Sequence, residues 1–156
     1  MQEVLFKLGL FGEGTPDRQA SERVLRALLD ALLIADIEYL RANPNTPRIY
    51  QAGVVYRREP LLDELAKMYP ECMTSCRPPV HPEEWKSIPY CIKDGHGDCE
   101  DLASWCCAER IVYDGLDAKT EFSFRELGKM LIYHIYVRLP DGQIEDPSLK
   151  LGMRRS

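Results

Sequence analysis

The longest helical pattern in the chain, residues 15–43, constrains the fold more than any other feature. Thr15 can cap the helix, Pro16 suits its first turn, and Asn43 followed by proline ends it. Between Val24 and Tyr39, apolar residues recur at helical spacing, and further apolar residues widen the stripe. We therefore expect a long core helix that is buried on much of its circumference.

Length and composition indicate one soluble globular domain, residues 1–156. The chain is 45% hydrophobic and 29% charged, with a formal net charge of -5. It has no lysine- and arginine-rich block, so we expect neither a nucleic acid nor an anionic membrane as partner. The first residues, MQEVLFKLGLFGEG, lack the basic lead of a signal peptide, and no apolar run could span a bilayer. These features predict a cytoplasmic protein with six reduced cysteines.

The two halves of the domain carry different patterns. In the helical N-terminal half, residues 1–80, an extended segment should follow the long helix at residues 48–59, and a short helix should cover residues 61–69. A proline-rich loop over residues 70–89 could hold one helical turn at EEWKSI. In the second half, residues 85–153, Asp98 is a good cap for a helix from Cys99 to about Tyr113. Strands are expected at residues 118–124, 130–139 and 143–148, which makes the fold class α+β.

Cys99 stands at the predicted helix start within GHGDCEDLASW. A thiol attacks as a thiolate, and a helix N-terminus lowers a thiol pKa. The neighbouring acids at 98, 100 and 101 would oppose this effect if they faced the sulfur. As cap and first-turn residues, we expect them to turn to their own backbone amides. Cys99 is therefore a candidate nucleophile, with a metal ligand and a small buried hydrophobe as alternatives.

A hairpin places a histidine and an acid on one face of the predicted sheet. Of the three histidines, His134 is best placed because its strand can present a rigid imidazole to a packed helix start. PDG at residues 140–142 suits a three-residue loop with Gly142 in the left-handed conformation. Facing residues then sum to 282, so Asp146 shares a face with His134 and Glu145 points away. A two-residue loop would reverse the choice between the two acids.

These motifs together resemble the transglutaminase-like cysteine peptidase superfamily. GDCEDLA is followed by HIYV on a strand and then by DGQIEDPS, which is the order of a papain-like cysteine, histidine and aspartate. The resemblance implies a papain-like core with helices packed on an antiparallel sheet. It also implies that Cys99 is the nucleophile, His134 the base and Asp146 the residue that orients it. PRIYQAGVVYRREP, with a later EEW, is similar to small proteins of tailed-phage and prophage genomes.

The chemistry implied is acyl transfer to water or to an amine on a protein or peptide substrate, without a cofactor. The backbone N–H of Cys99 should help to hold the oxyanion. Members of the family often use an upstream aromatic or amide side chain as a further donor to the oxyanion. No residue here matches that position by spacing, and the candidates are Trp85, Tyr90 and Gln51.

Two alternatives come from other classes of protein. The chain could be a phage virion or assembly protein that keeps the fold and binds other virion proteins. It could also be a zinc-binding module, although the spacing is loose; the candidate ligands are Cys72, Cys76, His81 and Cys91. The remaining cysteines, Cys106 and Cys107, are expected to be core thiols.

Overall fold

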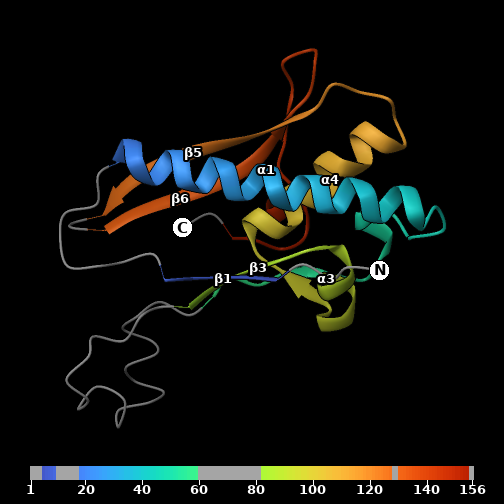
Figure 1. Cartoon of the computed structure of the whole chain (residues 1–156), viewed down its shortest axis with the longest axis horizontal. Helices are drawn as coiled ribbons and strands as arrows, with labels where there is room; N and C mark the ends of the chain where they lie inside the picture. The colour runs from blue at the N-terminus through green and yellow to red at the C-terminus, as the bar shows by residue number, and fades with distance from the viewer. Residues whose placement is uncertain (1–4, 10–17, 60–81, 128–129, 155–156) are drawn as a thin grey trace, which may run out of the picture.

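Helices and a sheet pack around one central helix in the computed structural model, which describes residues 5–9, 18–59, 82–127 and 130–154 (Figure 1). The central helix is α4, Cys99–Val112, and every residue from Cys99 to Glu109 is buried. It packs against the long helix α1, Arg18–Ala42, and against strand β6, Met130–Arg138. The α+β class expected from the sequence is therefore observed.

The long helix α1 is less buried than its sequence predicts. Its fully buried positions form a single stripe, whereas Val24 and Ile34 are 52% and 62% exposed. The stripe also contains the buried carboxyl of Asp36. The expectation of burial around much of α1 is thus wrong, because α4 occupies the centre of the molecule and α1 covers one side of it. The buried apolar residues of the stripe are Leu25, Leu29, Leu32 and Leu40.

The largest sheet among the described residues is antiparallel, with strand order β5-β6-β7. β5 covers Lys119–Leu127, and β7 covers only Ile144–Glu145. Val137 pairs with Glu145, so facing residues do sum to 282 as predicted. Gly142 has φ of 86°, and two backbone hydrogen bonds close the loop, from Leu139 N to Gln143 O and from Gly142 N to Leu139 O. The three-residue loop is therefore confirmed, but α5, Pro147–Lys150, replaces the end of the predicted third strand.

Two small sheets come from pairings that the sequence analysis did not predict. β1, Leu5–Gly9, pairs antiparallel with β3, Pro82–Lys86, where a helical turn was expected. β2, Val55–Tyr56, pairs parallel with β4, His96–Gly97, and β4 directly precedes the N-cap of α4 in the chain. The extended segment expected over residues 48–59 begins instead with the 3-10 turn η1, Ile49–Gln51. The helix expected at 61–69 lies outside the described residues.

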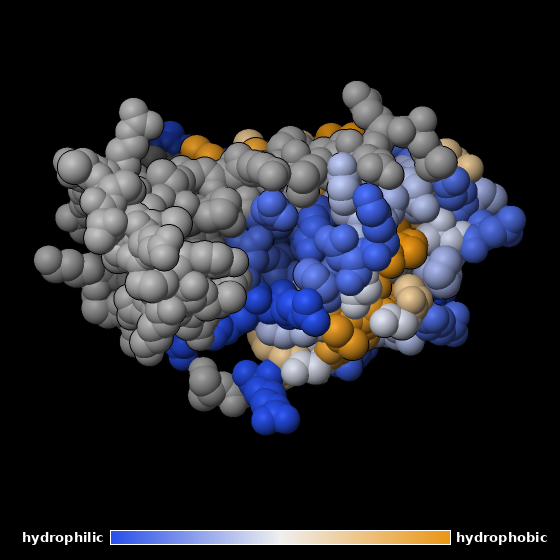
Figure 2. All heavy atoms as spheres, turned by 90° about the horizontal axis from the view of Figure 1, so that it is seen from below, coloured by the Kyte–Doolittle hydropathy of each residue, from blue (hydrophilic) through white to orange (hydrophobic). Residues whose placement is uncertain are grey.

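One further helix, α3, Ile88–Asp94, occupies the end of the predicted proline-rich loop. Pro89 lies in its first turn, where proline is tolerated, and Gly95 ends it in the left-handed conformation with φ of 73°. None of the described helices is long and apolar enough to cross a membrane. On the face seen in Figure 2, hydrophilic residues surround a smaller apolar group.

Candidate active site

The start of α4 is built by a capping box. Asp98 is the N-cap residue, as predicted, and the side chains of Asp98 and Asp101 each accept a hydrogen bond from the other's backbone N–H. Gly97 lies directly before this box, where an added Cβ would be 3.0 Å from the Asp101 Cβ and 3.3 Å from Cys91 Sγ. Any side chain at this position would therefore crowd the capping box and α3, which would have to shift by a few tenths of an ångström.

Cys99 is the first residue of α4, and only 8% of its surface is exposed. Its Sγ donates a hydrogen bond to Glu100 Oε2 at 3.1 Å. Burial, together with the charges of Glu100 and Asp98, raises the Cys99 pKa well above its ordinary value, although a backbone hydrogen bond from Ile135 opposes the rise. The expectations that the helix start lowers this pKa and that Glu100 turns to the backbone are therefore wrong. The resting nucleophile candidate is a neutral thiol.

His134 and Asp146 lie together, as the hairpin register requires. His134 Nε2 is 2.8 Å from Asp146 Oδ2, and Asp146 Oδ1 accepts a hydrogen bond from Leu149 N at 3.2 Å as the N-cap of α5. Burial alone would raise the Asp146 pKa, but the hydrogen bonds from His134 and from the α5 backbone lower it below its ordinary value. An ionised carboxylate can only accept, so Nε2 of His134 is the donor in this hydrogen bond.

The backbone connects this pair to Cys99. Ile135 follows His134 in β6, is fully buried, and makes the backbone hydrogen bond to the Cys99 thiol. The start of α4 therefore lies against β6 at the residue next to the histidine. The structure thus brings together the elements that carry Cys99, His134 and Asp146. Among the hydrogen bonds of the described residues, none joins the Cys99 thiol to the His134 ring.

Glu145 points to the opposite side of the hairpin, as predicted. Its carboxylate accepts hydrogen bonds from Tyr50, from Arg110 and from Lys150. Chiefly through Arg110, these donors lower the Glu145 pKa to about 2 in spite of its burial. Glu145 is thus an ion-pair partner of α4 rather than an alternative acid for His134.

Tyr56 is the aromatic residue near Cys99 that the sequence analysis missed. It lies on β2, beside Gly97 of β4, and its hydroxyl pKa is raised first by burial and then by Cys99 and the two acids that flank it. The hydroxyl therefore stays protonated beside the thiol. A two-residue parallel pairing places Tyr56 there, and no local sequence pattern signals such a pairing.

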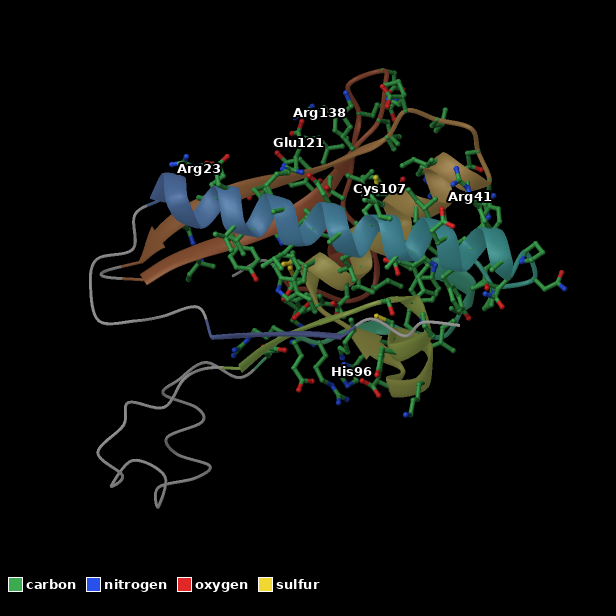
Figure 3. All side chains as sticks on the ribbon, viewed as in Figure 1. Arg23, Arg41, His96, Cys107, Glu121 and Arg138 are labelled. Atoms are coloured by element: carbon green, nitrogen blue, oxygen red, sulfur yellow. The ribbon has the colours of Figure 1, made fainter. Side chains whose placement is uncertain are left out.

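The three aromatic or amide candidates named from the sequence have other surroundings. Trp85 is fully buried in the core, Gln51 is exposed, and Lys93 Nζ lies 6.0 Å from the ring centroid of Tyr90. Of the other histidines, His96 lies near α3 with its Nδ1 3.4 Å from Lys86 Nζ. Figure 3 shows it well away from Glu121 and Arg138 of the β5–β6 sheet. His81 lies outside the described residues.

Of the four residues proposed as zinc ligands, the structure describes only Cys91. Cys72 and Cys76, like His81, lie outside the described residues, and Cys91 is fully buried with its Sγ donating to Lys86 O. Within the described ranges, no group of three or more histidine, cysteine and acidic side chains is arranged to hold a metal ion. The core thiols expected at Cys106 and Cys107 are both buried, as predicted, and burial raises the pKa of each to about 12.

The arrangement as a whole offers a buried thiol at a helix start, an imidazole oriented by a carboxylate, and a protonated phenol nearby. In nucleophilic catalysis, a thiol, an oriented imidazole and a phenol are the kinds of group that transfer protons and stabilise negative charge on a carbonyl oxygen. Comparison of the chain with protein-family models, with curated proteins and with solved structures found no match. A function must therefore be inferred from the residues and their geometry.

Proposed function

We propose that the protein is a cysteine-dependent acyl-transfer enzyme with a papain-like site made by Cys99, His134 and Asp146. The observation that carries the proposal is the 2.8 Å hydrogen bond between His134 and Asp146, on the strand whose next residue bonds to the Cys99 thiol. Nucleophilic catalysis by a thiol requires a histidine that is oriented by an acid, and here that histidine lies on the strand that packs against the helix start of Cys99.

The proposed reaction begins from the neutral thiol. The Cys99 proton moves to Nδ1 of His134 as Sγ bonds to the carbonyl carbon of a peptide or protein substrate. The carbonyl electron pair moves to oxygen, where the backbone N–H of Cys99 stabilises it. As the tetrahedral intermediate collapses, the bond to the leaving amine breaks and His134 returns the proton to that amine. Asp146 stabilises the imidazolium throughout. Attack by water on the acyl-enzyme gives hydrolysis, and attack by a lysine amine gives transamidation.

The burial of Cys99 favours a second candidate function. A thiol that is 8% exposed and hydrogen-bonded to Glu100 also suits a protein that keeps this fold and acts through its surface, such as a virion or assembly protein. In that case the pair of His134 and Asp146 would serve only to join β6 to α5. The two functions make opposite predictions for the reactivity of Cys99.

Acylation by a p-nitrophenyl ester tests the proposal. We expect a burst of nitrophenol with the acyl group mapped to Cys99, and no burst in Cys99→Ser. Asp146→Asn keeps the cap of α5 and should slow acylation by roughly a hundredfold or more. Cys107→Ser, which removes a buried thiol elsewhere on α4, is the matched control and should acylate at the wild-type rate. Equal rates for wild type and Asp146→Asn, or acylation at Cys91, would refute the proposed site and favour the surface function.

A further inference from the structure

A partly buried ion pair joins α4, which begins with Cys99, to β7, which ends one residue before Asp146. Arg110 donates from Nε to Glu145 Oε2 and from Nη2 to Glu145 Oε1, both at 2.8 Å. Tyr50 donates to the same carboxylate at 2.7 Å and Lys150 at 3.0 Å. The Glu145 side chain is 8% exposed and that of Arg110 is 16% exposed. Because the pairing of Arg110 with Glu145 is bidentate, it fixes the relative orientation of the two side chains as well as their distance.

The positions of these residues tie the pair to the proposed site. Arg110 lies on α4, which begins with Cys99, and Glu145 directly precedes Asp146. Eleven residues separate Cys99 from Arg110, which is a rise of about 16 Å along the helix. Arg110 is itself held by Asp114 at 2.8 Å, and Arg48 holds Asp114 at 2.9 Å. The far end of α4 is therefore anchored at the hairpin that carries Asp146.

The hairpin needs such an anchor because its last strand is short. β7 pairs with β6 over two residues, and Asp146 follows at once as the cap of α5. Backbone pairing alone leaves little to fix where Asp146 points, and small displacements in a catalytic group are costly. The Glu145 carboxylate, with donors from η1, α4 and α5, fixes the chain one residue before Asp146.

We propose that Arg110 and Glu145 are positioning residues, which hold Asp146 in register with His134 by fastening the β7 hairpin to the helix of Cys99. The inference rests on the proposed function for its effect on rate. The same ion pair should also fix the orientation of the His134 ring, and this effect does not depend on the proposed function. Glu145 thus positions Asp146, although its own side chain points away from His134.

Glu145→Gln tests the inference, with the 15N NMR signals of the His134 ring as the first readout. In the wild type we expect one tautomer, with the proton on Nε2. The variant should show a mixture of both tautomers, and acylation of Cys99 should slow by roughly tenfold or more. Arg110→Lys keeps the charge but loses the bidentate hydrogen bonding. It should show a smaller fraction of the second tautomer and a smaller loss of acylation rate than Glu145→Gln.

The matched control is a second ion pair in the same sheet. Arg138 binds Glu121 through Nε at 2.7 Å and Nη2 at 2.8 Å (Figure 3), and this pair is more exposed than the pair of Arg110 and Glu145. Glu121→Gln should leave the tautomer and the acylation rate unchanged. A wild-type tautomer in Glu145→Gln, or an equal change in Glu121→Gln, would overturn the inference. Failure of Asp146→Asn to slow acylation would instead count against the proposed function, while the tautomer readout still decides the role of Glu145.

Discussion

Replacing Glu100 by glutamine should make Cys99 more acidic and more reactive. Glu100 Oε2 lies 3.1 Å from Cys99 Sγ, and both residues are buried. At that distance, a thiolate and a carboxylate repel each other by about 5 kcal/mol at an effective dielectric constant of about 20. Glutamine removes this charge, keeps the size of the side chain and offers an N–H to the thiolate. The other flanking acid, Asp98, remains and continues to raise the pKa of Cys99.

The repulsion of about 5 kcal/mol corresponds to a pKa change of roughly 4 units, of which neighbouring groups will relax a part. We therefore expect Glu100→Gln to increase the thiolate fraction of Cys99 by roughly a hundredfold near neutral pH. The assay is the rate of iodoacetamide alkylation at Cys99, mapped by mass spectrometry as a function of pH. The ultraviolet absorbance of the thiolate, taken as a difference from Cys99→Ser, follows the same titration without requiring access of a reagent.

Glu109→Gln is the control, because Glu109 is a second buried glutamate on α4 and its carboxylate accepts a hydrogen bond from Ile49 N. It should leave the titration of Cys99 at the wild-type midpoint. An unchanged or higher midpoint in Glu100→Gln would contradict this prediction, since burial alone would then set the Cys99 pKa. Equal shifts in the two variants would show a general effect of charge rather than contact with Glu100.

Two further predictions concern the packing around α4. Gly97→Ala should destabilise the fold by about 1 to 3 kcal/mol in urea unfolding, because its Cβ would meet the Asp101 side chain at 3.0 Å and Cys91 Sγ at 3.3 Å; wild-type stability would mean that the capping box shifts freely. Asp36, whose carboxyl accepts from Ser104 Oγ at 2.6 Å, has its pKa raised to about 8 by burial. A raised pKa stabilises the fold fully below the unfolded value near 4, and this contribution is lost as pH rises toward 8. Asp36→Asn should therefore gain on the order of 3 kcal/mol relative to wild type between about pH 5 and pH 8, and parallel stability profiles would contradict this.

Local sequence patterns are sufficient to predict the features that depend on neighbouring residues in the chain. Asp98 starts α4 because a capping side chain acts within one helical turn. The loop PDG sets the hairpin register, and the register alone puts His134 and Asp146 on one face with Glu145 on the other. The candidate pair was therefore predictable, since turn chemistry and strand alternation are local and leave few choices.

The surroundings of the thiol and of the acids depend on contacts between segments that are far apart in the chain. The Glu100 carboxylate accepts a hydrogen bond from the Cys99 thiol, and Tyr56 lies on a two-residue parallel strand. Glu145 pairs with Arg110, which lies on a helix distant in the chain. The prediction that α1 is buried on much of its circumference is wrong because amphipathic spacing identifies an apolar stripe but not the elements that pack beside it. A pKa is set by burial and by charges within a few ångströms, and these come from segments far apart in the chain. The neutral resting state of Cys99 is for this reason a property of the packed molecule, although its place at the helix start is written in the sequence.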